Sequence, residues 1–160
     1  MAKNNLQKGD IIQTGLCYGY TKVKNNQVCN LPLMVAEIKD IVNKNVLLCK
    51  VIDSPETWVE IEDIHGIPLN KCILTLLGFE IIDKNDALCP GAPNFHGEAY
   101  EAEINGVKVQ IIEDNNSYNL CRGKTAPTIT IIYVHDIQNN KKENGEPLKI
   151  NYMMFYPNGE

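Results

Sequence analysis

The 160-residue chain lacks an excess of basic residues: 15 Lys and Arg stand against 20 Asp and Glu, giving a net charge of −5. Proteins that bind nucleic acid without sequence preference neutralise phosphates with clustered Lys and Arg, so we do not expect that activity. No apolar run approaches the roughly 18 residues of a membrane-spanning helix. The first ten residues also lack the apolar stretch of a signal peptide. We therefore expect a cytoplasmic protein that does not bind membranes.

No C-x-x-C pair occurs in the chain, and the gaps between its six cysteines are wide and irregular. In a cytosol such cysteines stay reduced, so we expect free thiols and no disulfide framework. Two of them, in VLLCKV and KCILTLL, sit inside apolar patterns typical of buried side chains. The pattern predicts neither a metal site nor a cofactor. The cysteines are Cys17, Cys29, Cys49, Cys72, Cys89 and Cys121.

Short strand patterns fill the first part of the chain. Apolar residues make up 44% of the sequence, enough for a core without metal or disulfide support. Four segments are apolar or alternate between apolar and polar residues, and turn residues separate them: 10–14, 33–42, 46–52 and 57–64. The segment 17–32 contains the Gly, Asn and Pro residues typical of a loop. The pattern predicts a small curled sheet or a Src-homology-3-like barrel over residues 1–67.

The clearest helix signal covers residues 70–77. Asn70 is the expected N-cap after Pro68, and apolar residues then recur at helical spacing. Gly78 is a natural left-handed stop, and Phe79 follows where a Schellman motif places its hydrophobic contact. We expect this helix to join the two parts of the chain.

The sequence pattern of the second part, residues 68–160, predicts an antiparallel sheet with a short helix. We expect this part to pack with the first part as one unit. Asn105-Gly106 is the favoured dipeptide of a type I′ hairpin turn. A short helix is expected from about residue 134 to a stop at Gly145, and residues 148–156 are a candidate final strand. The fold class is therefore α+β and mostly antiparallel β.

Two segments resemble a family of small uncharacterised proteins from phages and prophage regions of Bacteroidetes. Residues 61–80, IEDIHGIPLNKCILTLLGFE, are similar to its PIPLT…LGF segment, and residues 131–139, IIYVHDIQN, to its YVHxLQN segment. Asn70 replaces the family's usual Thr, and after Asn139 a polar stretch replaces an apolar one. The resemblance implies a phage or mobile-element origin and no known activity. Matching positions are Ile67, Pro68, Leu69, Leu74, Leu77, Gly78, Phe79, Tyr133, Val134, His135, Ile137, Gln138 and Asn139.

His135 and Asp136 are adjacent, so their side chains point in different directions and do not form a dyad by proximity. We favour a packing role in which His135 contacts the helix start at Pro68–Asn70, against the alternative of a general base. Structural roles are assigned to Pro68, Asn70, Gly78, Phe79, His135 and Gln138.

The loop 84–98 contains Cys89 and His96, which suggest either a nucleophile and base or two metal ligands. The spacing matches no common zinc pattern, and we favour a contact surface over an active site because long irregular loops are often functional. The pair Glu60 and Glu62 is interpreted as one solvated strand face.

The turn 121–127 contains Gly-Lys-Thr but not the upstream glycine of a phosphate-binding loop, because position 118 is Tyr. Arg122 and Lys124, with Tyr118 nearby, nevertheless suggest a site for a small anion such as a nucleotide phosphate. An ordinary basic turn is the alternative.

The sequence predicts a non-enzymatic binding protein in the host cell cytosol. The suspected origin suggests that it counters a host defence by binding a host protein or by sequestering a nucleotide signal. The sequence is also compatible with a homo-oligomer. Alternatives are a virion or assembly component with an interface through residues 151–156, and a hydrolase using Cys89 and His96.

Overall fold

The computed structural model describes residues 6–15, 18–24, 27–32, 34–49, 56–142 and 144–156. Its contacts divide the chain into two compact units: unit 1 is residues 1–76 with 133–160, and unit 2 is residues 77–132. The sequence predicted one boundary, after residue 67, and an uninterrupted second part. The observed division differs because elements after residue 133 pack on the first strands, α2 (Val134–Asn140) on β1 (Ile11–Gln13) and η4 (Tyr152–Phe155) on β4 (Val35–Val42).

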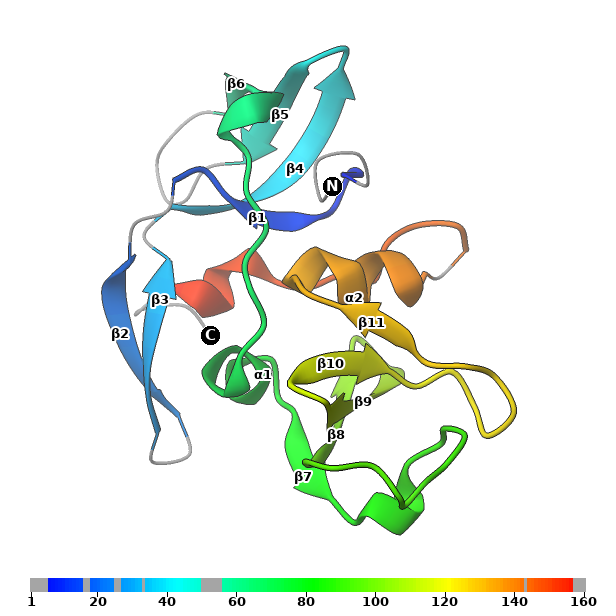
Figure 1. The fold of residues 1–160 in the computed structure, drawn as a ribbon. Helices are drawn as coiled ribbons and strands as arrows, with labels where there is room; N and C mark the ends of the chain where they lie inside the picture. The colour runs from blue at the N-terminus through cyan, green and yellow to red at the C-terminus, as the bar shows by residue number, and fades with distance from the viewer. Residues whose placement is uncertain are drawn as a thin grey trace. The chain divides into compact units, whose positions relative to one another are not determined.

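Unit 1 is built on a four-stranded antiparallel sheet (Figure 1). Its order is β1, β4, β5 (Asn45–Cys49) and β6 (Thr57–Glu60). Asn43, with φ of 55°, makes the tight turn between β4 and β5, where an Asn tolerates the left-handed conformation. The sheet is open among the described residues, and no closed barrel is found there. The Src-homology-3-like character of this part stays a prediction.

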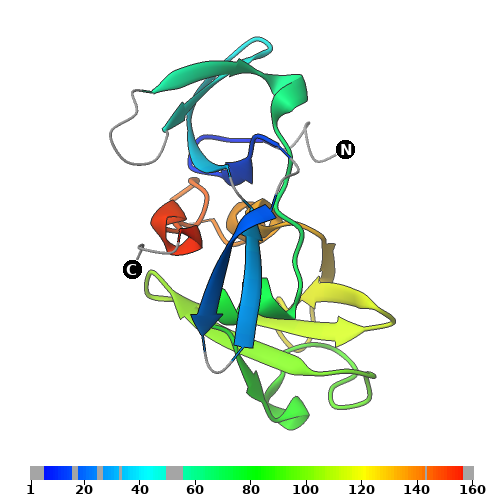
Figure 2. The ribbon, with the colours of Figure 1, turned by 90° about the vertical axis from the view of Figure 1, so that its left-hand side faces the viewer.

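A separate two-stranded hairpin occupies most of the segment expected to be a loop. Its strands are β2 (Tyr18–Lys24) and β3 (Gln27–Pro32), which lie side by side in Figure 2. The loop expectation was wrong because it relied on the turn-type residues of this segment, whereas main-chain pairing and the burial of Cys29 and Leu31 decide the conformation. The positions of Cys17 and of the Cys49 side chain lie outside what the structure describes.

One core cluster of unit 1 joins Ile12 of β1 and apolar residues of β4 and β5 to the segment after η2 (Ile61–Asp63). All three residues of β1 are buried, so both faces of this strand are covered. The expected final strand at residues 148–156 is instead an irregular segment followed by η4, whose start is capped by Asn151 accepting from the Met153 N–H at 3.0 Å. The core cluster consists of Ile12, Ala36, Ile38, Val46, Leu48 and Ile64.

The helix α1 (Lys71–Leu76) confirms the helix predicted at residues 70–77. Asn70 is its N-cap, because its side-chain oxygen accepts from the Ile73 N–H at 2.8 Å. Gly78 follows with φ of 97°, a conformation that favours glycine, and Phe79 is buried. Among the described residues, no helix has both the length and the apolar character to cross a membrane.

Unit 2 is a five-stranded antiparallel sheet in the order β11 (Ile129–Ile131), β10 (Ser117–Leu120), β9 (Val107–Asp114), β8 (Ala99–Ile104) and β7 (Glu80–Ile82). The predicted β8–β9 hairpin is confirmed, because Asn105 and Gly106 both have positive φ, at 52° and 81°. With two antiparallel sheets and few helices, the fold is α+β and mostly antiparallel β, as expected.

Candidate functional site

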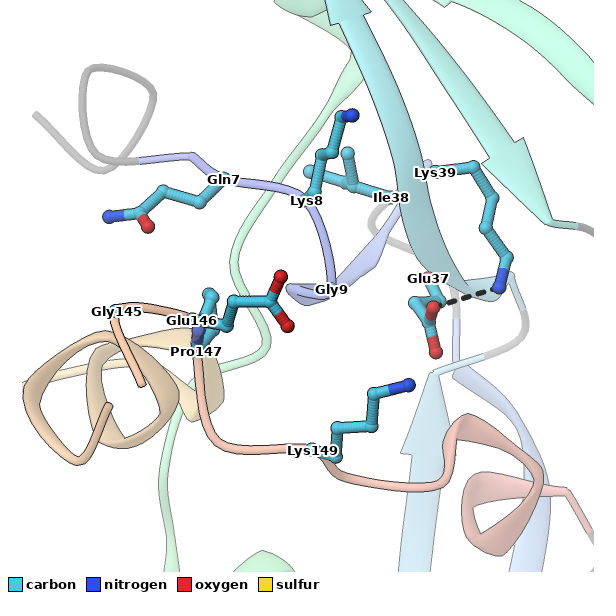
Figure 3. Close-up of a pocket in the computed structure, with 10 residues that line it drawn as sticks. All are labelled: Gln7, Lys8, Gly9, Glu37, Ile38, Lys39, Gly145, Glu146, Pro147 and Lys149. Carbon is cyan, nitrogen blue, oxygen red and sulfur yellow. Dashed lines mark hydrogen bonds and ion pairs between the residues drawn. The ribbon is translucent and has the colours of Figure 1, made fainter. Parts of the chain in front are cut away.

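A cavity of about 350 Å³ opens in unit 1 between three segments that are distant in sequence. They are the N-terminal turn at residues 7–9, the middle of β4 at residues 37–39, and the segment 145–149 that follows α2 (Figure 3). Its volume lies within the range of roughly 300–1,000 Å³ typical of small-molecule sites. We call it the lysine cavity, because each of the three segments contributes one lysine: Lys8, Lys39 and Lys149.

The backbone of the N-terminal turn is tied to β4. The Gly9 N–H donates to the Ile38 carbonyl at 2.8 Å, and the Ile38 N–H donates to the Asp10 carbonyl at 3.0 Å. Gly9 has φ of 91°, so the turn requires a residue that adopts the left-handed region without strain. These bonds hold Lys8 beside Lys39.

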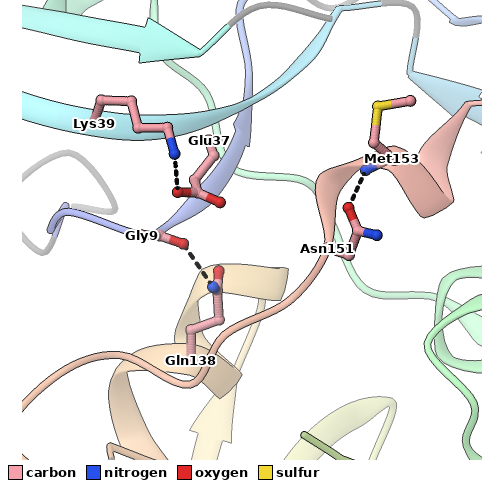
Figure 4. Close-up of polar contacts among 6 residues, drawn as sticks. All are labelled: Gly9, Glu37, Lys39, Gln138, Asn151 and Met153. Carbon is pink, nitrogen blue, oxygen red and sulfur yellow. Dashed lines mark hydrogen bonds and ion pairs between the residues drawn. The ribbon is translucent and has the colours of Figure 1, made fainter.

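The third wall is held in place by α2. Gln138, fully buried, donates from Nε2 to the carbonyls of Gly9 and Leu148, each at 2.8 Å, and the first of these bonds is drawn in Figure 4. Its Oε1 accepts from the Ile11 N–H at 2.8 Å. One side chain therefore joins the N-terminal turn, β1 and the segment that carries Lys149.

The charges around the cavity are mixed in sign. Lys39 pairs with Glu37 at 2.9 Å, and Lys8 lies 3.9 Å from Asp40, both at solvent-exposed positions where such pairs are weak. Lys149 makes no ion pair within the described part of the chain. Figure 3 shows the side chains of Lys149 and Glu37 in the space between β4 and the 145–149 segment. Ammonium groups bind anions, and the carboxylates of Glu37 and Glu146 accept N–H donors.

Asp10 lies directly after the turn and is fully buried. Its Oδ2 accepts from the Gln7 N–H at 2.8 Å and from Asn139 Nδ2 at 3.2 Å, whereas its Oδ1 has no hydrogen-bond partner among the described residues. Burial raises the pKa of this carboxyl to about 7, against the lowering effect of the two hydrogen bonds. Sequence reasoning did not single out Asp10, since an acid in a polar N-terminal segment gives no signal of burial.

The predicted Cys89 and His96 are placed in different environments in unit 2. Cys89 is buried in an apolar cluster with Phe95 and Cys121, among other residues. His96 is exposed, and its main-chain N–H donates to the Asp114 carboxylate at 3.2 Å. A thiol buried in apolar surroundings is a poor nucleophile. The loop 84–98 therefore packs its apolar residues on the sheet and presents His96 to solvent.

The predicted anion site around Tyr118 contains a carboxylate. Glu113 pairs with Tyr118 across β9 and β10, and the pKa of Tyr118 is raised, first by burial and then by Glu113. Burial followed by Glu113 and Tyr118 likewise raises the pKa of Tyr100 to about 12. Arg122 and Lys124 are exposed, and Arg122 donates from Nε to the Pro127 carbonyl at 2.8 Å. The negative charge beside Tyr118 disfavours an anion there.

The two family-like segments meet in unit 1. The Val134 N–H donates to the Ile67 carbonyl at 2.9 Å, and Pro68 forms an isolated bridge with Tyr133. His135 is fully buried with its ring stacked on Tyr133, the centroids 5.4 Å apart. A Cβ atom at Gly66 would lie 2.4 Å from the Tyr133 ring and 2.9 Å from His135 Cε1, so only glycine fits there.

Asp136 caps the helix that it belongs to. Its Oδ2 accepts from the Tyr133 N–H at 2.8 Å, which caps the start of α2. His135 therefore lies against Gly66 and Tyr133, next to the helix start that the sequence associated with it. The predicted contact of His135 with Pro68–Asn70 itself stays a prediction.

Sequence reasoning missed the lysine cavity. Its three lysines lie far apart in the sequence, with Lys8 and Lys149 near opposite ends of the chain, so no local pattern links them. Among the described residues, no group of three or more His, Cys, Asp or Glu side chains is placed to hold a metal ion. No protein-family model, curated protein or solved structure matches the chain.

Proposed function

We propose that the chain is a non-enzymatic binding protein of phage or mobile-element origin that acts in the host cytosol. The lysine cavity is its ligand site, and the ligand is a small anionic molecule of nucleotide size. The observation that carries this proposal is that Lys8, Lys39 and Lys149, from three separate segments, line one cavity of about 350 Å³.

The mixed charge of the cavity supports a ligand with two kinds of group. The ammonium of Lys149, which has no ion-pair partner among the described residues, is available to a phosphate or carboxylate. The carboxylates of Glu37 and Glu146 suit N–H donors such as the amino group of a nucleobase. A nucleotide carries both groups, so sequestering a nucleotide signal of a host defence is the function that we favour.

The host-protein alternative uses unit 2. His96, Arg122 and Lys124 are all exposed there and offer polar contacts to a protein partner. The hydrolase alternative has less support, because Cys89 is buried among apolar side chains. A virion or assembly role through residues 151–156 also has less support, because Phe155 and Tyr156 are buried and Tyr156 exchanges hydrogen bonds with the main chain of Val35.

The test is a calorimetric titration of the protein with nucleoside mono- and diphosphates and with inorganic phosphate. Lys149→Glu should weaken nucleotide binding by about tenfold or more, because it replaces an attractive charge with a repulsive one. Lys44→Glu is the matched control, since Lys44 is exposed in the β4–β5 turn outside the cavity, and it should bind like the parent.

Equal binding by Lys149→Glu and the parent protein would place the ligand elsewhere. Native mass spectrometry of the protein taken from infected cells supplies a second criterion. A mass added by a nucleotide supports sequestration, and a bare monomer contradicts it.

A further inference from the structure

Two cysteines of unit 1 lie together although they belong to different elements. Cys29 is in β3 of the hairpin, and Cys72 is in the first turn of α1, which packs on β3. The Cys72 thiol donates to the carbonyl of Val28, the residue before Cys29, at 3.5 Å, and the two thiols are close enough for Cys72 to affect the pKa of Cys29. Both cysteines are free in the structure.

The two thiols differ in their access to solvent. Cys29 is fully buried, whereas Cys72 is half-buried, so a dissolved oxidant reaches Cys72 first. Burial and then the Cys72 thiol raise the pKa of Cys29 to about 12. Cys29 is therefore a neutral thiol in the reduced protein, held next to the sulfur that it would attack.

We propose that Cys29 and Cys72 form a reversible disulfide that links the β2–β3 hairpin to α1. With hydrogen peroxide as oxidant, the Cys72 thiolate attacks one peroxide oxygen, which breaks the O–O bond and leaves a sulfenic acid and hydroxide. The Cys29 sulfur, on losing its proton, then attacks the Cys72 sulfur and expels a second hydroxide. The two released protons convert both hydroxides to water, and a dithiol reductant reverses the bond.

The Cys29–Cys72 pair differs from the other described cysteines in that one of its thiols, that of Cys72, is partly accessible to solvent. Cys89 and Cys121 are both buried in the apolar cluster of unit 2. The link would join two elements, β3 and α1, that the reduced protein connects through packing and through the hydrogen bond from the Cys72 thiol to the Val28 carbonyl. A cross-link between residues distant in sequence restricts the unfolded chain, so the oxidised protein should resist unfolding more than the reduced protein.

The experiment oxidises the folded full-length chain with hydrogen peroxide, blocks the remaining thiols with an alkylating reagent, and digests with trypsin. Cleavage after Lys24, Lys39, Lys71 and Lys84 releases peptides 25–39 and 72–84, each with a single cysteine. We expect a linked pair of these peptides, lighter by about 2 Da than their sum because two hydrogens are lost. Dithiothreitol should abolish the linked pair, and the oxidised protein should unfold at a higher urea concentration.

Cys72→Ser should yield no linked pair, whereas Cys121→Ser, the control in unit 2, should yield as much as the parent protein. The proposal is overturned if the folded parent protein oxidises Cys72 without the linked pair appearing. It is equally overturned if Cys72 is recovered in a disulfide with another cysteine, or if the pair forms only after unfolding in urea.

Discussion

Each unit of this protein contains a buried glutamine whose amide makes three hydrogen bonds, Gln138 in unit 1 and Gln110 in unit 2. Unit 1 also buries Gln13, which donates from Nε2 to the Gly66 carbonyl at 2.9 Å. Gln138 uses its amide for three main-chain partners: the Ile11 N–H and the carbonyls of Gly9 and Leu148. Gln110 accepts from the Leu88 N–H at 2.8 Å and donates to the Asp86 carbonyl at 3.1 Å and to the Glu101 carboxylate at 2.9 Å. Both side chains thus satisfy backbone groups outside the strands, at Gly9 and Leu148 and at Asp86 and Leu88, and Gln138 also binds the N–H of Ile11 in β1.

The difference lies in what surrounds the two amides. The partners of Gln138 flank Asp10, a buried carboxyl whose pKa is raised to about 7 by desolvation. The carboxylate beside Gln110 is Glu101, which is partly exposed, and its pKa is lowered, first by the hydrogen bond from Gln110 and further by Lys108. We therefore expect Gln138 to contribute more to stability than Gln110, because water cannot replace the partners that a buried amide loses.

Replacing Gln138 should have the largest effect. Gln138→Leu leaves the Ile11 N–H and two carbonyls without partners in a buried site. We therefore expect a loss of about 3–5 kcal/mol in the free energy of unfolding. Urea unfolding followed by the fluorescence of Trp58, the single tryptophan and part of unit 1, measures it.

The control for Gln138 is Asn140, an exposed amide on the same helix. Asn140→Ala should change the free energy of unfolding by at most about 0.5 kcal/mol, as is usual for surface substitutions. Equal losses in the two variants would contradict the role of Gln138.

The second effect is the pH dependence caused by Asp10. The pKa of Asp10 rises from 3.8 in the unfolded chain to about 7 in the fold. At a pH between these two pKa values, Asp10 is protonated in the folded protein but ionised in the unfolded chain. The free energy of unfolding should therefore fall by about 2–4 kcal/mol as the pH rises from about 4 to about 7, and level off above that.

Asp10→Asn should remove this slope and be more stable than the parent protein at about pH 8 but not at about pH 4. Asp63→Asn, at an exposed position of η2, is the control and should retain the parent's slope. Urea unfolding at a series of pH values measures both variants. An unchanged slope in Asp10→Asn would show that another group titrates.

The smallest effect is expected at Gln110. Gln110→Leu should cost about 1–3 kcal/mol, because Glu101 is partly exposed and regains water. The segment 86–88 should lose its anchor, so hydrogen exchange of the Leu88 amide should accelerate by about tenfold or more. Asn119→Ala, on the neighbouring strand β10, should leave the Leu88 amide unchanged. Slow exchange at Leu88 in Gln110→Leu would mean that the loop is held by its apolar residues alone.

Local sequence signals anticipated several elements. Asn70 and Gly78 bound α1, and Asn105-Gly106 turns the β8–β9 hairpin, as the sequence predicts. The hairpin at β2 and β3 was missed because its side chains alternate poorly and its stability depends on partners. The final strand expected at residues 148–156 was wrong, because residues 152–155 of that apolar stretch form a short 3₁₀ helix, η4.

Local sequence signals were also limited in predicting sites. The turn residues and charges of the sequence indicated the turn 121–127 and the loop 84–98. In the structure, polar residues of these two segments are exposed, and apolar residues of both belong to one buried cluster. The lysine cavity and the Cys29–Cys72 pair give no such signal, because each combines residues from different parts of the chain.

By itself, the sequence determined the β-rich class, the ends of α1 and the type I′ turn, because each depends on backbone preferences within a few residues. Only the tertiary structure decided that Lys8, Lys39 and Lys149 line one cavity and that Asp10 is buried with a raised pKa. Those properties arise from which distant segments pack together, and hydrophobic burial, which drives that packing, is not directional enough to be read from local pattern.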